Sequence, residues 1–292
     1  MKTVIILIEL STYILTAIVI IHAWRKKPYF VFVILAAIIF GFLAEYSAVS
    51  KIPQPYNYPH SLIALPGPVP LNICLGWGII IYAAMQTAEK LKTKWWLNSL
   101  IAGFLAVIID FAEDPPYVKM GLWEWTPPHP EAWFGILWSN YVGWFLIVVI
   151  FVFILELITR FFPTGKHVLR DAVIPFVAVI FSFAVFMGAI LSYFWIINLG
   201  WNWLNESLLT MIIFTICAVP VVLNIPKMDR NNKIDWVILA VPLYIFFWAL
   251  VGFFSTGLYF EKQALVIVIP FVIIISMLGY LWPSLNVICK KK

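Results

Sequence analysis

Long apolar runs repeat along this chain, and short polar or charged segments separate them. A helix of about twenty apolar residues is long enough to cross the ~30 Å hydrocarbon core of a bilayer. Nine runs of roughly this length occur, at residues 3–24, 29–48, 69–88, 96–113, 136–159, 172–197, 207–225, 236–257 and 264–284. Because helices satisfy their backbone polar groups within one segment, the pattern predicts an all-α, polytopic transmembrane helical bundle of about nine spans.

Composition supports this fold class. The chain is 63% hydrophobic and only 11% charged, and its mean hydropathy is +0.98. We expect a single integral membrane domain over residues 1–292. Within it, residues 1–145 carry unusual polar groups and form a site-bearing half, whereas residues 146–292 form an apolar scaffold half.

Basic residues predict the orientation of the spans, because Lys and Arg are retained on the cytoplasmic side of a membrane. Only Lys2, Lys51, Lys119 and Lys262 lie outside five clusters that occupy every second connection. The clusters are Arg25, Lys26, Lys27; Lys90, Lys92, Lys94; Arg160, Lys166, Arg170; Lys227, Arg230, Lys233; and Lys290, Lys291, Lys292. We therefore expect a multi-pass protein of the cell membrane with its N-terminus outside and its C-terminus inside. The net charge of +5 reflects this topology, and we infer no binding of nucleic acid.

Acidic residues gather at one depth in the first half of the chain. Counting ~1.5 Å per residue from the inner ends of the spans places Glu9, Glu45 and Asp110 in the outer third of the bilayer. A carboxylate at this depth is costly unless it is paired, protonated or open to a wet cavity. Three acids on three spans are therefore candidates for function.

The stretch "IDFAEDPPYVKMGLWEW" adds two more acids to this layer. Asp110, Glu113 and Asp114 share one helix face, because they are spaced i, i+3, i+4. Crowded carboxylates in a medium of low dielectric cannot all ionise, so at least one is expected to keep its proton and act as a buried general acid. The alternative is that Glu113 and Asp114 only end the helix ahead of Pro115 and Pro116, exposed at the interface. We expect this second role for Glu113 more than for Asp114.

Two proline-rich, aromatic segments flank the acid layer on the outer side. The first contributes Tyr56, Tyr58 and His60, the second contributes Trp123 and Trp125, and the start of the fifth span adds Asn140 and Trp144. Aromatic residues at a membrane face often form only an interfacial belt. The many prolines favour a stiffer arrangement, a fixed lid over an acidic cavity.

Several chemistries lack their motifs in this sequence. No HxxxH array, HExxH, dinucleotide fingerprint or GxSxG is present, so di-iron, zinc, nicotinamide, flavin and serine-hydrolase mechanisms are unsupported. The three cysteines have no metal-ligand spacing, and we predict no metal site. Acid chemistry on a hydrophobic substrate remains. Protonating an alkene needs a neutral carboxylic acid in a dry site, with aromatic faces to shield the cation that forms.

Three blocks of sequence carry a resemblance to a known family. They are "FLAEYSAV", "YNYPHSLIALPGPVPLNICLGW" and "DFAEDPPYVKMGLWEW…WFGILWSNYVGW". In order and spacing they resemble the membrane family of carotenoid biosynthesis proteins that includes carotenoid 1,2-hydratases of myxoxanthophyll and bacterioruberin synthesis. The resemblance implies a hydro-lyase that adds water to the terminal C1=C2 double bond of an acyclic carotenoid, without a cofactor.

The same resemblance implies roles for particular residues. Asp114 or Asp110 would protonate C-2 of the end group. Trp77, Trp123, Trp125 and Tyr58 would shield the cation at C-1. Glu45, Asn140 or His60 would position the water. Expected partners are a carotenoid or other isoprenoid substrate, the lipid bilayer and other membrane enzymes of the carotenoid pathway.

Two other functions fit parts of the pattern. Asp110 and Asp114 have the spacing of a magnesium-diphosphate motif, as in a membrane prenyltransferase, although a second Asp-rich motif and outer basic residues are missing. Glu9, Glu45 and Asp110 could instead form the relay of a non-enzymatic, proton-coupled carrier of a hydrophobic small molecule. A carrier would be expected to continue its polar groups toward the inner face, where the spans have few.

Overall fold

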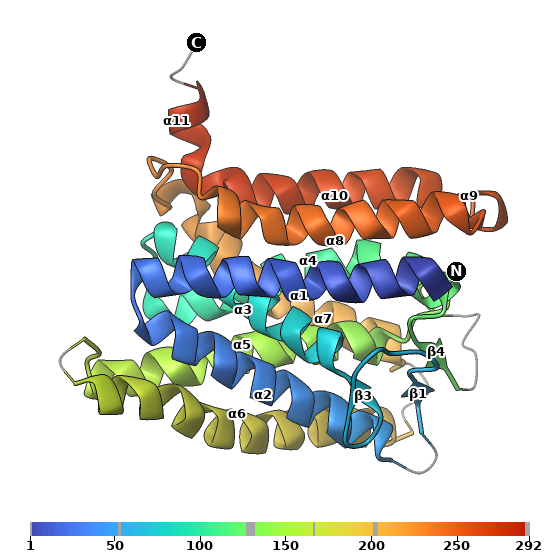
Figure 1. The fold of residues 1–292 in the computed structure, drawn as a ribbon, viewed down its shortest axis with the longest axis horizontal. Helices are drawn as coiled ribbons and strands as arrows, with labels where there is room; N and C mark the ends of the chain where they lie inside the picture. The colour runs from blue at the N-terminus through green and yellow to red at the C-terminus, as the bar shows by residue number, and fades with distance from the viewer. Residues whose placement is uncertain (1, 52–53, 127–131, 166, 201–203, 290–292) are drawn as a thin grey trace.

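The computed structural model describes residues 2–51, 54–126, 132–165, 167–200 and 204–289. Within these residues, nine helical segments are long and apolar enough to cross a membrane, and they run along the long axis of the molecule (Figure 1). The predicted all-α bundle of about nine spans is confirmed. Parts of the two predicted proline-rich segments, residues 52–53 and 127–131, fall outside the described ranges.

The spanning helices follow the predicted runs closely. They are α1 (Lys2–Lys26), α2 (Tyr29–Val49), α3 (Leu71–Lys90), α4 (Trp95–Met120), α5 (Trp138–Phe161), α6 (Val168–Ile197), α7 (Glu206–Asn224), α8 (Trp236–Ser255) and α10 (Leu265–Leu281). The shorter elements are β1 (Tyr56–Asn57), β2 (Ala64–Leu65), β3 (Val69–Pro70), β4 (Glu124–Trp125), α9 (Leu258–Glu261), α11 (Leu285–Cys289) and the 3₁₀ turns Ile225–Lys227 and Trp282–Ser284.

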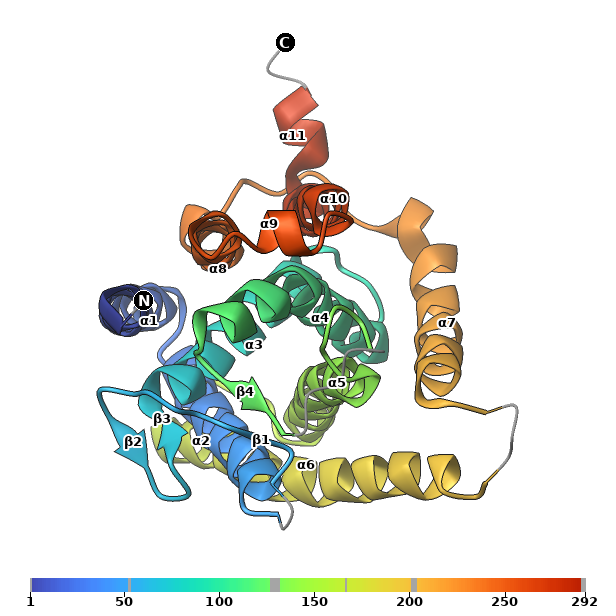
Figure 2. The ribbon, with the colours of Figure 1, turned by 90° about the vertical axis from the view of Figure 1, so that its right-hand side faces the viewer.

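Helices α3 and α4 form the centre of the bundle, and the other spans surround them (Figure 2). In α3, 78% of the spanning window is buried inside the protein, against 11% in α7. Helix α3 is the least apolar of these nine segments, and its central place keeps its buried polar residues Asn72, Gln86 and Thr87 away from lipid. Helix α2 approaches α3 closely at Gly78 and Gly41. A Cβ atom would lie 2.5 Å from the Ile38 side chain at Gly78 and 2.5 Å from the Trp77 side chain at Gly41.

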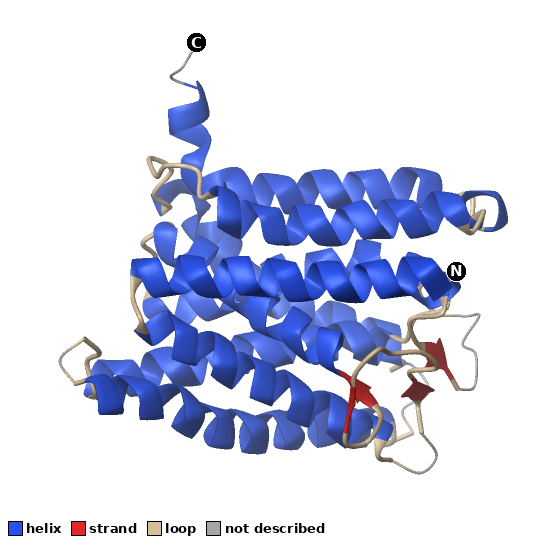
Figure 3. Cartoon of the chain, in the orientation of Figure 1, coloured by secondary structure: helices blue, strands red, loops and turns tan. Residues whose placement is uncertain are grey.

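The two proline-rich segments meet at the end of the bundle that carries the N-terminus, which we call the N-terminal end (Figure 3). Strands β1 and β4 pair antiparallel, with Tyr56 opposite Trp125, although 68 residues of chain separate their starts. Strands β2 and β3 form a second ribbon. The backbone N–H of Leu62 donates to both carboxylate oxygens of Glu9 on α1, at 3.0 and 2.9 Å. We call the described parts of these two segments, residues 54–70 and 121–126, the lid. They pair with each other and are anchored to the bundle.

Helix α4 corrects one expectation, because it does not stop ahead of Pro115 and Pro116 but continues to Met120. Gly121, in the left-handed region at φ 80°, ends it. The prolines remove two helical N–H donors, which isolated helices tolerate poorly, yet membrane bundles accept prolines where neighbouring helices hold the segment. Here Tyr117 and Met120 pack against Ile5, Ile8 and Ala249. Tertiary packing therefore outweighs the local preference.

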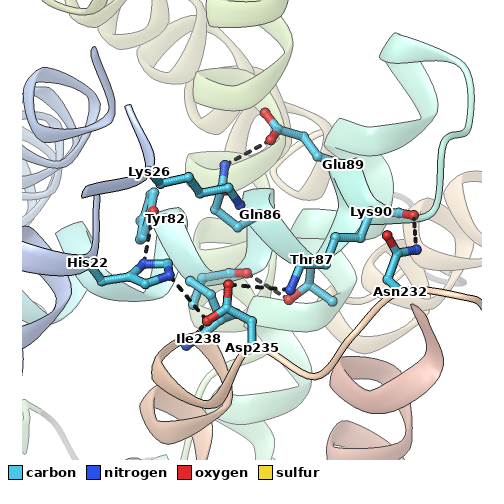
Figure 4. Close-up of polar contacts among 11 residues, drawn as sticks. His22, Lys26, Tyr82, Gln86, Thr87, Glu89, Lys90, Asn232, Asp235 and Ile238 are labelled. Atoms are coloured by element: carbon cyan, nitrogen blue, oxygen red, sulfur yellow. Dashed lines mark hydrogen bonds and ion pairs between the residues drawn. The ribbon is translucent and has the colours of Figure 1, made fainter. Parts of the chain in front are cut away.

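A polar network joins α1, α3 and α8 at the opposite end (Figure 4). Asp235 lies 3.3 Å from His22 Nε2 and 3.4 Å from Lys90 Nζ, and its carboxylate also accepts the N–H of Ile238 as the cap of α8. His22 contacts the hydroxyl of Tyr82 at 3.3 Å. Burial would raise the pKa of Asp235, but the charges of Lys90 and His22 outweigh it and hold the pKa below 3.8.

Asp235→Asn tests how much this charge network stabilises the bundle. Asparagine caps a helix about as well as aspartate, so the variant removes the charge and keeps the cap. Because the folded-state pKa of Asp235 is lowered, its charge stabilises the fold above the unfolded pKa, and this contribution is lost as the pH falls through the folded pKa. We expect a lower thermal midpoint than wild type at pH 7 in detergent, and a difference that narrows below pH ~4. A difference of equal size at pH 3 would contradict this.

The orientation of the bundle remains a prediction from the basic residues. Lys92 lies in the turn after α3, and Lys119 lies near the end of α4, so the two mark opposite ends. Single cysteines at these positions, introduced after Cys74, Cys217 and Cys289 have been replaced by serine, can be labelled in intact cells with a membrane-impermeant maleimide. We expect labelling at position 119 and protection at position 92 until the cells are permeabilised. The reverse pattern would invert the topology.

Candidate functional site

A cavity of about 80 Å³ lies at the N-terminal end, among α1, α2, α3, α4, α5, α8 and the lid. We call it the acid chamber. Nine of the eleven site residues expected from the sequence line it: Glu45, Tyr56, Tyr58, Trp77, Asp114, Trp123, Trp125, Asn140 and Trp144. The fold therefore brings together residues from four separate parts of the chain.

Asp110 and Asp114 on α4 form a pair of neighbouring carboxylates at one side of the chamber. Asn140 on α5 donates its side-chain N–H groups to both, at 3.0 Å to Asp110 Oδ2 and 2.6 Å to Asp114 Oδ2. Asp110 is fully buried and its Oδ1 has no hydrogen-bond partner. It lies behind Asp114, which lines the chamber. Two neighbouring carboxylates that share an uncharged donor cannot both ionise without strong repulsion, so this pair is suited to hold a proton.

Glu45 on α2 has a very different environment. One oxygen accepts the hydroxyls of Tyr56 at 2.5 Å and Tyr58 at 2.7 Å, and the other accepts Trp77 Nε1–H at 2.9 Å. Burial, and next the charge of Glu45, raise the pKa of Tyr56 and of Tyr58 well above 10, so both hydroxyls stay protonated and donate. Three donors to one carboxylate favour its ionised form. Glu45 is therefore suited to be the anion of the chamber.

Eight of the twenty-one described residues that line the chamber are aromatic. The rings of Trp77 and Trp144 lie 4.3 Å apart between centroids, and those of Tyr56 and Trp125 lie 5.1 Å apart. Trp123 packs edge-on against both Tyr58 and Tyr117. Aromatic faces attract a cation by their quadrupole, and the attraction is stronger where water is excluded. The walls therefore suit a positively charged intermediate of a hydrophobic substrate.

Three predicted residues are placed differently from the expectation. His60 is exposed on the lid and lines neither the acid chamber nor its neighbours, so the structure does not bring it to the site. Glu9 is buried, but its carboxylate holds the lid through Leu62 and accepts the hydroxyl of Tyr13. Its position fits an anchor of the lid. Glu113 was expected at the exposed interface, and instead it is only 8% exposed and lines the chamber, because α4 continues past the prolines.

Several chamber residues escaped the sequence analysis. Tyr117 lies one turn beyond Asp114, on the part of α4 that was not expected to be helical. Asn72 at the start of α3 is buried with its Oδ1 unpartnered. Tyr244 comes from α8 in the apolar half, and its hydroxyl donates to the carbonyl of Ile8 at 2.7 Å. A lone tyrosine in an apolar span was the only signal for this last contact.

Among the described residues that line the chamber, none is Lys, Arg or His. No group of three His, Cys, Asp or Glu side chains in the described ranges is arranged to hold a metal ion. The chamber therefore offers a proton donor, an anion and aromatic faces, but no fixed positive charge for a diphosphate. This set is suited to protonating an apolar double bond.

One protein-family model matches most of the chain. The model of the family described as carotenoid biosynthesis protein matches residues 1–201. The chain belongs to this family. The matched residues contain Glu45, Asp110, Asp114 and Asn140 and end after α6. Searches of the curated proteins and of the solved structures found no match. A role in carotenoid biosynthesis, a hydrophobic substrate and a multi-pass membrane protein are thus supported together.

Proposed function

We propose that this protein is a cofactor-independent carotenoid 1,2-hydratase, which adds water to the terminal C1=C2 double bond of an acyclic carotenoid end group. One observation carries the proposal. Asp114, backed by Asp110, and Glu45 line the same small aromatic chamber, in environments that favour opposite protonation states. Two carboxyl groups kept in different states can act as acid and base in one reaction.

Asp114 is the proton donor in the proposed reaction. Its O–H bond breaks and the proton bonds to C-2, so that positive charge develops at C-1. Asp110 does not line the chamber and shares the Asn140 donor with Asp114. We therefore regard Asp110 as a positioning residue whose charge opposes ionisation of Asp114. Markovnikov protonation of this kind gives a tertiary cation, which Trp77, Trp123, Trp125, Trp144 and Tyr58 would shield.

Water completes the addition. A lone pair of the water molecule forms the new C–O bond at C-1, and the proton that the water loses passes to the Glu45 carboxylate. Return of this proton from Glu45 to Asp114 through solvent restores the starting state. The sum is one water added to one double bond, so neither an oxidant nor a reductant is consumed.

A direct test is expression of the chain in a host that makes lycopene, with the pigments separated and their masses measured. We expect products heavier than lycopene by one or two water molecules and carrying tertiary hydroxyl groups. A host that makes the protein in its membranes but only unchanged lycopene would count against this substrate. Placement in the cell membrane and association with other carotenoid enzymes belong to the same proposal and can be tested by fractionation of that host.

Substitution of single acids tests the assignment of the donor. Asp114→Asn keeps the shape but removes the transferable proton, and loss of a general acid typically lowers the rate by ~10² to 10⁴-fold. We expect a loss in this range for Asp114→Asn, and also a clear loss for Asp110→Asn. Glu113→Gln should cost far less, because Glu113 does not share the Asn140 donor.

Glu156→Gln is the matched control for these variants, since Glu156 is another partly buried acid in a span, near the other end of α5, and does not line the chamber. All rates are compared in membranes at equal protein levels. Near-normal turnover in Asp114→Asn and Asp110→Asn together with a loss in Glu113→Gln would show that Glu113 is the donor.

Chelation separates the hydratase from the alternative prenyltransferase. A divalent cation bound between Asp110 and Asp114 would keep both ionised and abolish the acid. We therefore expect hydration in membranes to survive EDTA. Loss of turnover in EDTA that magnesium restores would favour the prenyltransferase, which the absence of Lys, Arg and His from the described chamber lining argues against.

A further inference from the structure

A second cavity lies beside the acid chamber, between α2, α5 and α6, and we call it the lateral cavity. Its volume is about 260 Å³. Helix α6 runs along the outside of α2 and α5 and closes this side of the bundle (Figure 2). Its small and apolar lining residues include Ala44 and Ala48 of α2, Gly143 and Ile147 of α5, and Phe186 and Ile190 of α6, and the charged residues Lys51 and Glu206 line it too.

The two cavities share a wall. Glu45, Tyr56, Trp77, Trp125, Asn140 and Trp144 line both of them. The acid chamber thus has a neighbour of larger volume, and these six side chains belong to the linings of both cavities. A ligand with a reactive end and a long apolar body could occupy both spaces at once.

The volumes indicate how such a ligand would be divided. A dry protein cavity of about 150 Å³ is enough to hold benzene. At about 80 Å³ the acid chamber has room for a small end group, whereas the lateral cavity has room for a longer piece of hydrocarbon chain. Ala44 and Ala48 on α2 and Gly143 on α5 are small residues, and they leave the space that the lateral cavity occupies.

We propose that the lateral cavity binds the polyene chain next to the reacting bond, so that the end group reaches the acid chamber past the shared wall. The proposal rests on the proposed function for the identity of the chain, an acyclic carotenoid. It makes Gly143 and Ala48 determinants of substrate length. Substrates too short to occupy the lateral cavity would bind through the acid chamber alone.

A larger side chain at Gly143, which lines the lateral cavity, tests whether the polyene binds there. A Cβ atom there would have no neighbour within 4 Å, so Gly143→Leu can be built without a backbone clash and places a side chain in the lateral cavity. Replacing glycine within a helix also favours the helix. Ala48→Phe fills the same cavity from α2 and provides an independent second variant.

Gly188 is the matched control. It too has open space around its Cβ position, and it lies on α6 two residues after Phe186, which places it on the opposite side of that helix. Gly188 is exposed and does not line the lateral cavity. Gly188→Leu therefore makes the same chemical change on the same bundle, outside the proposed site.

Binding is measured without reference to catalysis. Each variant is purified from lycopene-producing membranes at equal yield, and the pigment and phospholipid retained per protein are quantified by absorbance and mass spectrometry. A side chain that occupies the lateral cavity excludes the polyene from it, so we expect lycopene retention to fall at least about tenfold in Gly143→Leu and Ala48→Phe. Gly188→Leu should stay within about twofold of wild type, as surface changes usually do.

Turnover then tests the length dependence. With lycopene, Gly143→Leu and Ala48→Phe should lower hydration at least about tenfold. With a five-carbon alkene that has the same end group, small enough for the acid chamber alone, they should stay within about twofold. Unchanged lycopene retention in both filling variants would overturn the proposal, and so would loss of bound phospholipid with no change in pigment. If wild type hydrates neither substrate, the proposed function fails, while selective loss of pigment binding would still support the lateral cavity.

Discussion

The site depends on one buried carboxylate, that of Glu45, and on the three donors that hold it. Taking an ion out of water costs several kcal/mol unless hydrogen bonds replace the lost solvent. Tyr56 and Tyr58 from the lid and Trp77 from α3 supply these bonds, at 2.5 to 2.9 Å. The same contacts fix the lid over α2 and α3, and Gly41 leaves the space in which Trp77 lies. Tyr56, Tyr58 and Trp77 therefore both stabilise the buried charge and hold the lid in place.

The opposite side of the acid chamber has the reverse property. Asp110 and Asp114 receive N–H groups from one uncharged amide, Asn140, and Asp110 Oδ1 is left without a partner. Hydrogen bonds donated to a carboxylate stabilise its ionised form, whereas a neighbouring carboxylate of like charge destabilises that form. Glu45 and the Asp110–Asp114 pair thus differ in the number of hydrogen-bond donors per carboxylate. The fold sets this number, because it places α2 against the lid and α3, and α4 against α5. In this arrangement, an acid and a base can coexist in one small volume.

The sequence predicted the spans well because lipid imposes one requirement on every span, about twenty apolar residues. The chamber residues could be predicted as a group, since acids and aromatics are rare inside membranes and stand out. His60 and Glu113 were misplaced, because a loop histidine can point either way and because the stop at Pro115 is only a local preference. The lateral cavity was not predictable, since it arises where small residues of separate helices meet.

Continuation of α4 through Pro115 and Pro116 explains why the apolar half matters for chemistry. It carries Tyr117 and Met120 into contact with Ile5, Ile8 and Ala249 of α1 and α8. Tyr244 then binds the carbonyl of Ile8 and closes the chamber from that side. Exclusion of water favours the neutral form of a carboxylic acid, which is the form that can donate a proton to the substrate. Helix α8 therefore contributes to the acid site as a mainly apolar wall that also makes a polar contact, that of the Tyr244 hydroxyl with the carbonyl of Ile8.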